Sequence, residues 1–366
     1  MSFSSLAKLP LGTAMFDQFL GMPPHPTKCQ ATYIWIDITG QSLRSKTRTL
    51  PEAPKTLQDY PMWNHGWRHD WTDQGKFYEN TLKPVAHYPD PFLGGQNRLV
   101  LCEVYSPEGK PVATNYRHDC NQVMQKCAKE KPWFGIEQEY MLLDSDKHPL
   151  GWPKNGQPTP SGDTMPYYCG IGVDKVVGRE VVEAHYRACL LAGIEIGGTN
   201  SEGTFGQWEF QIGICEGIDM GDQLWMARYL LHRVAEKFGV IASLDPKLPA
   251  VEAGDWFGSG CHTNFSSAST RAEGGIKFIE AAMPKLAIHQ EKHLSMYGSD
   301  NEKRLTGKLC TPSMQHFTWG VADRGASVRI PQQVADEGKG YMEDRRPASN
   351  CDPYRVTGAI ASACLL

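Results

Sequence analysis

The sequence predicts an α+β protein with two domains, a small β-rich domain followed by a larger one in which strands and helices alternate. Its 366 residues exceed the length of one ordinary small domain. The first third contains β-rich runs separated by turn residues, which is typical of a mostly antiparallel sheet. The remainder combines strand patterns with two helical patterns that end at glycines, a favourable residue for a helix C-terminus.

Composition and charge exclude several classes of protein. A net charge of −4, from 37 basic and 41 acidic residues, argues against a nucleic-acid partner. No apolar run approaches the roughly 20 residues that span a bilayer. Lys8, Pro10 and Asp17 interrupt the N-terminus, so no signal peptide is expected. The 11 cysteines form no C-x-x-C pair, which is typical of reduced thiols in a cytoplasmic protein and gives no support for a zinc cluster.

The elements of the small domain follow from local patterns. Residues 31–50 contain a β-rich run, TGQS turn residues and an alternating run, which together predict a hairpin. Residues 61–75 are rich in Trp, His and Gly without a clear period, and are expected to form a loop. Residues 98–105, RLVLCEVY, predict a buried strand, and a helix is expected to start near Asn115.

The larger domain shows clearer periodicity. PWFGIEQEYMLL, residues 132–143, predicts a strand, as do IEIGGTN at 194–200 and the strictly alternating GQWEFQIG at 206–213. Helical spacing over 179–192 and 221–238 ends at Gly193 and Gly239 respectively. The strand at 206–213 should direct its Trp, Phe and Ile inward and its Gln and Glu side chains to the other face.

The strand at 132–143 carries the first chemical signal. Glu137 and Glu139 would share one face about 7 Å apart, which requires a cation, a proton or open water between them. Taken alone, this pair is more typical of an exposed edge strand. Further ligand-type residues stand in strands or at strand ends, namely Glu202, Glu209, His262 and Glu343. Five carboxylates and one imidazole suit Mg²⁺ or Mn²⁺, although each residue alone could be structural.

A set of arginines complements these carboxylates: Arg304, Arg324, Arg329 and Arg345. Guanidinium groups bind phosphate and carboxylate oxygens two at a time. Carboxylate-bound metals beside convergent arginines are what phosphoryl transfer from ATP requires. The alternative, that these arginines form surface salt bridges, remains open from the sequence alone.

Longer motifs carry a specific resemblance. PWFGIEQEY, VEAHYRACL, QWEFQIG, GCHTNFS, RLTG, GASVRIP and GYMEDRRPASNCDP closely resemble type II glutamine synthetase of eukaryotes, with wording near the fungal and plant forms, from about Tyr33 to the C-terminus. The resemblance implies an N-terminal arm at 1–30, a β-grasp domain at 31–113 and a catalytic domain at 114–366. The catalytic domain would have a curved antiparallel sheet with flanking helices. Active sites would lie between subunits of a two-ring oligomer, expected to be a decamer.

The resemblance also implies roles for individual residues. In that family ATP phosphorylates the side-chain carboxylate of glutamate, and ammonia then displaces phosphate from the acyl phosphate. Two or three Mg²⁺ or Mn²⁺ ions would be held by one set of Glu139, Glu202 and Glu209 and a second set of Glu137, His262 and Glu343. Contacts to ATP would come from Trp133, Asn264, Ser266, Arg271, Arg329 and Tyr341. Catalytic arginines would be Arg304, which grips the amino acid, and Arg324 and Arg345, which act with Arg329 on the phosphates.

Three departures from the family pattern fall on substrate chemistry. Gly66, in WNHGWRH, stands where the family has an aspartate that helps bind ammonium. Cys310, in RLTGKLCT, replaces the glutamate of the flap that completes the ammonium pocket. Phe257, in WFGSG, replaces an asparagine that contacts the substrate amino acid. Binding of NH₄⁺ needs negative charge around it, and two such charges are missing.

Three functions remain open from the sequence. We expect an ATP-dependent carboxylate–amine ligase that acts on glutamate or a related acid, with an amine other than plain ammonia. The first alternative is ordinary glutamine synthesis, with partial compensation by His65, His69 or Asp70. The second is a catalytically impaired paralogue that binds nucleotide and acts as a regulatory or assembly partner. Cys310 could be a nucleophile, but a small residue in a shortened flap is the simpler interpretation.

Overall fold

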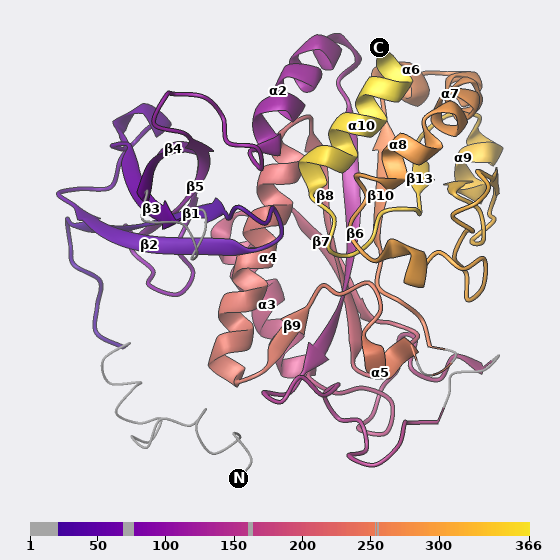
Figure 1. Ribbon diagram of the computed structural model, residues 1–366, viewed down its shortest axis with the longest axis horizontal. Helices are drawn as coiled ribbons and strands as arrows, with labels where there is room; N and C mark the ends of the chain where they lie inside the picture. The colour runs from indigo at the N-terminus through magenta and orange to yellow at the C-terminus, as the bar shows by residue number, and fades with distance from the viewer. Residues whose placement is uncertain (1–20, 69–76, 160–163, 253, 255) are drawn as a thin grey trace. The chain divides into compact units, whose positions relative to one another are not determined.

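The computed structural model describes residues 21–68, 77–159, 164–252, 254 and 256–366 (Figure 1). The described chain divides into two compact units by its internal contacts. The first comprises residues up to Asp119 together with Ala188–Ile194, and the second comprises Cys120–Arg187 and Glu195–Leu366.

The first unit contains a five-stranded sheet in the order β2-β1-β5-β4-β3. The pairing of β1 with β5 is parallel, and the other pairs are antiparallel. The strands are β1 Cys29–Ile36, β2 Leu43–Leu50, β3 Trp63–Arg68, β4 Phe77–Pro89 and β5 Arg98–Tyr105, with a 3₁₀ turn, η2, at Leu57–Asp59. The hairpin and the strand expected at 98–105 are therefore confirmed.

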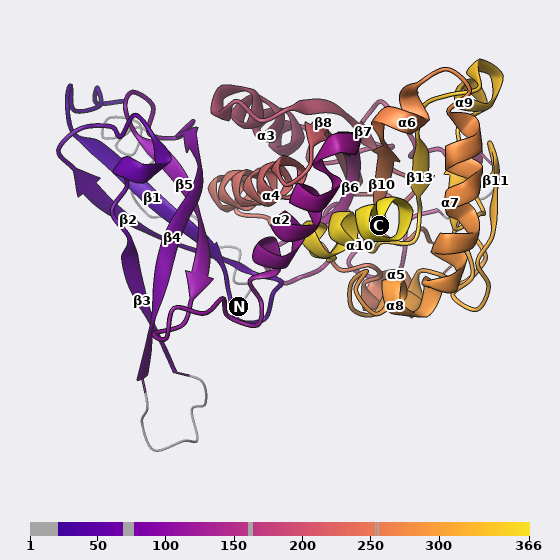
Figure 2. The ribbon, with the colours of Figure 1, turned by 90° about the horizontal axis from the view of Figure 1, so that it is seen from above.

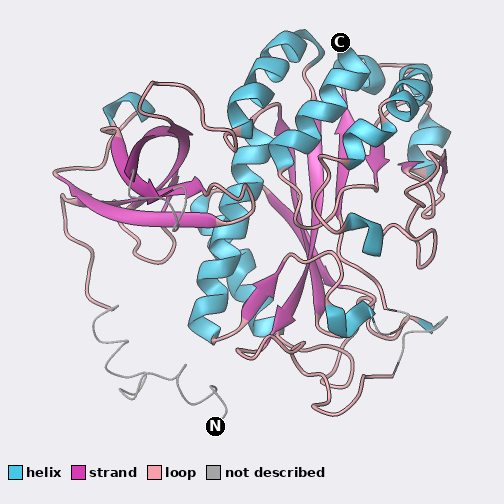
Figure 3. Ribbon diagram, viewed as in Figure 1, coloured by secondary structure: helices cyan, strands magenta, loops and turns pink. Residues whose placement is uncertain are grey.

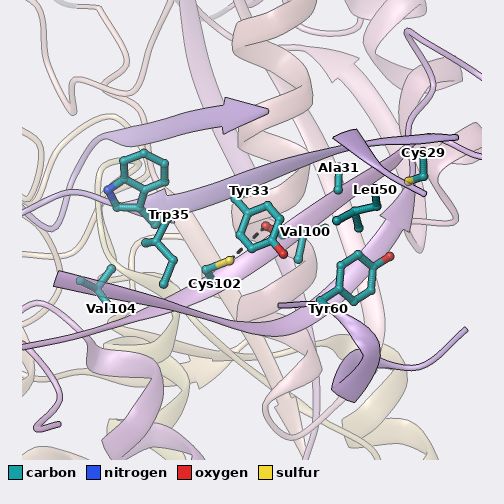
Figure 4. Close-up of a cluster of buried hydrophobic side chains, with 10 residues drawn as sticks. Cys29, Ala31, Tyr33, Trp35, Leu50, Tyr60, Val100, Cys102 and Val104 are labelled. Carbon is teal, nitrogen blue, oxygen red and sulfur yellow. Dashed lines mark hydrogen bonds between the residues drawn. The ribbon is translucent and has the colours of Figure 1, made fainter. Parts of the chain in front are cut away.

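Alternate residues of β1 form the core of this sheet. Tyr33 and Trp35 are buried with Val100 and Cys102 of β5 in the cluster shown in Figure 4. The Tyr33 hydroxyl donates a hydrogen bond of 2.6 Å to the carbonyl of Pro61, so this buried polar atom is satisfied.

The second unit is built on an eight-stranded sheet, in which β11-β12-β13-β10-β6-β8-β7 form the main path and β9 pairs with β6. All pairs are antiparallel except β11–β12. The strands are β6 Trp133–Leu143, β7 Ile196–Ser201, β8 Gln207–Glu216, β9 Ile241–Ser243, β10 Cys261–Ser266, β11 Trp319–Val321, β12 Val328–Ile330 and β13 Met342–Asp344.

Helices flank this sheet (Figures 2 and 3). The α-helices are α2 Tyr116–Cys127, α3 Arg179–Ala192, α4 Asp219–Phe238, α5 Pro249–Glu252, α6 Ala268–Arg271, α7 Ile276–Ile288, α8 Gln290–Leu294, α9 Gln332–Glu337 and α10 Pro353–Leu365, and the 3₁₀ turns are η3 Ala128–Glu130 and η5 Asn301–Lys303. The longest, α4, ends at Gly239 in the left-handed conformation that glycine adopts without strain. The predicted α+β class, with a curved sheet and flanking helices, is confirmed.

A buried arginine joins α4 to the central strand. Arg228 donates through Nε to Gln138 Oε1 of β6 at 2.8 Å. Its other nitrogens reach the carbonyls of Cys351 at 2.8 Å and Ser349 at 3.0 Å. Gln138 is also buried and itself donates to the carbonyls of Glu139 and Ser349. The helix-side face of β6 is therefore fixed by a satisfied polar hub as well as by apolar packing.

Two expectations need correction. The strand at 132–143 does not lie at an edge, because β6 pairs with both β8 and β10. The expected loop at 61–75 contains a strand, β3, which is held by its pairing with β4 and not by a period of its own. Residues 69–75 of that stretch, with His69 and Asp70, lie outside the described part of the chain.

The buried hub predicts a large effect of one substitution in α4. Arg228→Met should lower the free energy of unfolding by about 3 kcal/mol or more, because Gln138 and two carbonyls lose a charged donor in a dry environment. Arg233→Met, in the same helix, removes a partly exposed ion pair with Glu236 and should cost less than about 1 kcal/mol. Urea unfolding of the two variants measures the difference, and equal midpoints would contradict the role of the hub.

Candidate metal and nucleotide site

The site is assembled by strand register on one face of the larger sheet. Glu137 of β6 lies opposite His262 of β10, and Glu139 lies opposite Glu209 of β8. Residues directly opposite one another in an antiparallel pair point to the same face. On the other side of β10, Glu343 of β13 pairs with Asn264, which continues the same face.

The structure brings the six ligand-type residues together as two adjoining clusters. The first contains Glu139, Glu202 and Glu209, and the second contains Glu137, His262 and Glu343. In each cluster one ligand atom per residue lies within 4.8 Å of the others. Five carboxylates and one imidazole provide mostly oxygen ligands, which fit hard divalent cations. Since β6 supplies one carboxylate to each cluster, the two candidate metal positions are neighbours.

The first cluster is electrostatically strained without a cation. Burial raises the pKa of both Glu202 and Glu209, and repulsion from the carboxylates around them raises it further. Glu139 is oriented by the backbone N–H of Gly260, which donates to its Oε2 at 2.7 Å. A bound divalent cation would compensate the concentrated negative charge, so the residues fit a metal site.

The second cluster contains a neutral imidazole. Burial, followed by the charge of Arg345, lowers the pKa of His262 to about 4. Its Nδ1 lies 3.5 Å from Glu137 Oε2 and 3.6 Å from Glu343 Oε1. Neutral imidazole is the form that binds metals, so this histidine is ready to act as a ligand near neutral pH.

Two arginines converge on Glu343. Arg329 Nε donates to Glu343 Oε2, and Arg345 Nη1 donates to Oε1 at 2.5 Å. Arg345 also donates to the carbonyls of Arg324, at 3.0 Å, and Cys310, at 3.2 Å. The surface salt-bridge interpretation is therefore wrong for Arg345, which is buried, whereas the Arg324 side chain is exposed. The cationic groups border the second cluster, where phosphate oxygens could be bound.

Arg304 lies deeper than the sequence indicates. Its side chain is 3% exposed, and burial lowers its pKa to about 10. Its Nη2 donates to the carbonyls of Arg345, Arg346 and Pro347 at 3.1, 2.7 and 3.0 Å. In this structure, Arg304 holds the chain segment that follows β13.

The expected nucleotide residues fall into two groups. Trp133, Ser266 and Arg271 contact one another, with the Arg271 guanidinium 3.8 Å from the Trp133 ring centre and its Nη1 donating to Ser266 Oγ at 2.9 Å. A partly exposed cation–aromatic pair of this kind offers planar surfaces on which a base can stack. Asn264 donates to Glu137 Oε1 at 3.0 Å, and Tyr341 is 41% exposed.

The three residues that the sequence analysis interprets as departures from the family pattern lie in different surroundings. Gly66 is in β3 opposite Glu79, and a Cβ at Gly66 would meet nothing within 4 Å. The Phe257 ring packs on Gly203, where an added Cβ would lie 2.6 Å from Phe257 Cδ2. Cys310 is exposed and has a positive φ of 56°.

Orienting residues were missed by the sequence reasoning. Gln207 Nε2 donates to Glu139 Oε2 at 3.3 Å, Gln211 Nε2 donates to Glu209 Oε1 at 2.7 Å, and Asn200 Nδ2 donates to Glu202 Oε1 at 2.8 Å. The sequence predicts the polar face of β8, but it assigns a function only to Glu209 on that face. Gln207 and Gln211 each stand two residues from Glu209 on β8 and therefore share its face. This spacing is the sequence signal that could have identified both amides.

This fold and site define a class of metal-dependent, phosphate-binding enzyme. Residues 116–275 match the family described as "Glutamine synthetase, catalytic domain". The chain is 59% identical to "Probable glutamine synthetase" of Caenorhabditis elegans, over 98% of both chains. It is 52% identical to "Glutamine synthetase 2 cytoplasmic" of Drosophila melanogaster over 96% of this chain and 94% of the relative, and 53% identical to "Glutamine synthetase" of Bos taurus over 94% and 91%.

The chain therefore belongs to the glutamine synthetase family and is a carbon–nitrogen ligase of that family. The family uses ATP and divalent metals. The sequence motifs predict a protein close to the fungal and plant forms of the family. The three relatives named above are animal proteins. The names of these relatives favour ordinary glutamine synthesis over the expected change of amine. In the described part of the chain, no helix has the length and apolar character needed to span a membrane.

The raised carboxyl pKa values predict a pH-dependent stability for the metal-free protein. A carboxyl with a higher pKa in the folded state keeps its proton there. The free energy of unfolding therefore falls as the pH rises above the ordinary glutamate pKa of 4.5. We expect each such carboxyl to contribute a loss of about 1.4 kcal/mol per pH unit between about pH 5 and 7. Urea unfolding in the presence of a chelator measures this loss.

Three comparisons control this measurement. Glu209→Gln should flatten the profile relative to the unchanged protein, while Glu236→Gln at the exposed surface of α4 should not. Saturating Mg²⁺ should also remove most of the pH dependence, because the ion binds the ionised carboxylates. Identical profiles for the unchanged protein and Glu209→Gln would show that this carboxyl has an ordinary pKa.

Proposed function

We propose that this protein synthesises glutamine from glutamate, ammonia and ATP through a γ-glutamyl phosphate. The observation that carries the proposal is the pair of oxygen-rich clusters on one sheet face, with Arg329 and Arg345 bonded to Glu343 at their border. The names of the relatives support the same reaction.

The reaction proceeds in two balanced steps. A glutamate carboxylate oxygen attacks the γ-phosphorus of ATP, and ADP leaves with the electron pair of the broken P–O bond. The ammonia nitrogen then attacks the acyl carbon, and the C–O bond to phosphate breaks. The nitrogen passes one proton to the departing phosphate as the amide forms, so the phosphate leaves as HPO₄²⁻. Phosphorylation is needed because a free carboxylate has no adequate leaving group.

The chain's own residues would position these groups. We propose that Glu139, Glu202 and Glu209 hold one Mg²⁺ or Mn²⁺ ion, and that Glu137, His262 and Glu343 hold a second. When bound, the ions neutralise phosphate oxygens. Arg329, Arg345 and Arg324 would stabilise charge on the transferred phosphoryl group, and Arg304 would bind the amino acid. Trp133, Asn264, Ser266, Arg271 and Tyr341 would contact the nucleotide.

A second candidate keeps the acyl phosphate but uses another amine. The observation that favours it is the Phe257 ring packed on Gly203 beside Glu202. The motif comparison adds the interpretation that Gly66 and Cys310 stand at positions of two ammonium-site carboxylates. A catalytically impaired paralogue fits less well, because such a protein has little reason to keep six ligands and the arginines.

We also propose that the protein forms a two-ring decamer in the cytoplasm, with active sites between neighbouring subunits. This proposal rests on membership of the family.

Phosphate release with Mg²⁺, ATP, glutamate and ammonia tests the proposed reaction, and glutamine should accumulate in equal amount. Arg345→Lys should lower kcat about 10²-fold, because a point charge replaces a fork that contacts several acceptors at once. Arg233→Lys, remote from the clusters in α4, should leave kcat unchanged. Absence of glutamine from the unchanged protein, with ATP still bound, would reject ordinary synthesis.

A double variant separates the two amines. Gly66→Asp with Cys310→Glu introduces carboxylates at the two positions that the motif comparison assigns to the ammonium site, and the open space at Gly66 accepts a side chain. If the natural amine is not ammonia, kcat/KM for ammonia should rise about 10²-fold or more. If the protein already makes glutamine, as proposed, the change should stay below about tenfold. Gly66→Asn with Cys310→Gln is the matched uncharged control.

A further inference from the structure

A cavity of about 260 Å³ lies on the face of the sheet opposite the two carboxylate clusters. Phe265 of β10 and Met342 of β13 line it and pair directly across the strands. Because side chains alternate along a strand, these two residues point away from the face that carries Asn264 and Glu343. The cavity is therefore separate from the proposed active site. It is bordered by α6, α7 and the end of α10, which lie around β10 and β13 in Figure 2.

The size and the walls fit an aromatic ring. Phe265, Met342 and Ile279 are at most 3% exposed, whereas Phe278 is 47% exposed. An apolar cavity of about 150 Å³ is large enough for benzene. A volume of about 260 Å³ therefore leaves room for a ring with a short chain.

The charged groups of the lining differ in what they contact. The carboxylate of Glu130 accepts hydrogen bonds from the Ser269 backbone N–H at 3.1 Å and from its hydroxyl at 3.0 Å, and these bonds lower its pKa. Lys285 of α7 donates through Nζ to the carbonyl of Cys364 at 3.3 Å. Among the described residues, no carboxylate lies within ion-pair distance of Lys285. An exposed ammonium group with only a neutral acceptor beside an apolar cavity favours an anionic ligand.

We propose that this cavity binds a small arylalkyl carboxylate, with the ring against the exposed Phe278 and the carboxylate on Lys285. We further propose that its occupancy changes nucleotide affinity, a coupling that rests on the proposed function. Phe265 lies between Asn264 and Ser266 in β10. Thr270, which lines the cavity, precedes Arg271, whose guanidinium contacts Ser266 and Trp133. A ligand that shifts α6 would therefore move groups on the nucleotide face.

Binding is tested on the full chain without nucleotide, by saturation-transfer NMR with 3-phenylpropionate as the probe. We expect saturable binding with a Kd of about 1 mM or tighter, as is ordinary for a ligand of this size. The neutral analogue 3-phenylpropanol should bind at least about tenfold more weakly. Absence of saturable binding, or equal binding of the alcohol, would overturn the proposed ligand class.

Two variants and a control locate the site. Lys285→Met should weaken binding of the acid about tenfold without affecting the alcohol. Ala281→Trp, at an exposed lining position that tolerates a larger side chain, should block both ligands. Lys237→Met in the last turn of α4 should change neither Kd. If the acid binds Lys285→Met and Ala281→Trp with the same Kd as the unchanged protein, the cavity is not the binding site.

The coupling has its own measurement. ATP affinity in the presence of Mg²⁺ should change about threefold or more when 3-phenylpropionate is saturating, and the acid's affinity should change by the same factor with ATP. Acid binding with an unchanged ATP Kd would overturn the coupling. Failure of ATP itself to bind would count against the proposed function. The proposed ligand of the cavity would still be tested by the Kd of 3-phenylpropionate.

Discussion

The convergence of buried carboxylates on one face of β6 is the constraint on which the larger unit depends. Glu137 and Glu139 stand two residues apart on a central strand, and the neighbouring strands add Glu209, His262 and Glu343 to the same face. Like charges in a buried site raise one another's pKa and destabilise the fold unless a cation or a proton intervenes. A metal requirement for stability and a metal requirement for chemistry therefore have the same physical origin.

The opposite face of the sheet keeps this arrangement in register. Arg228 binds Gln138 and the carbonyls of Ser349 and Cys351, so α4, β6 and the segment before α10 are joined through one guanidinium. On the ligand side, Arg304 lies near His262 and Glu139 and holds the segment after β13, which carries Arg345, through three carbonyls. Each of these arginines stabilises only because its donors meet carbonyl or amide oxygens in a dry interior. The position of the ligands is thus set by polar contacts on both faces of the sheet.

Much of the fold followed from periodicity. Alternation over 132–143 and 206–213 predicted β6 and β8 and the face that each side chain would take, and the burial of Ile136, Tyr140 and Phe210 agrees. The pattern could not show that β6 is central, because a Glu-x-Glu strand has the same sequence pattern at the edge of a sheet as it has at a metal site in the middle of one. The strand β3 was missed for a related reason: its order depends on β4, and its own residues have no strand period.

The sequence by itself determined the class of elements, the family and the residue types available for chemistry, because these depend on local spacing and on long ordered motifs. Only the tertiary structure decided which residues meet. His262 lies 125 positions after Glu137 in the chain, yet the register of β10 on β6 places them face to face. The cavity behind Phe265 likewise exists only because α6, α7 and α10 pack around that strand. Long-range pairing and packing fix such contacts, and no local pattern encodes them.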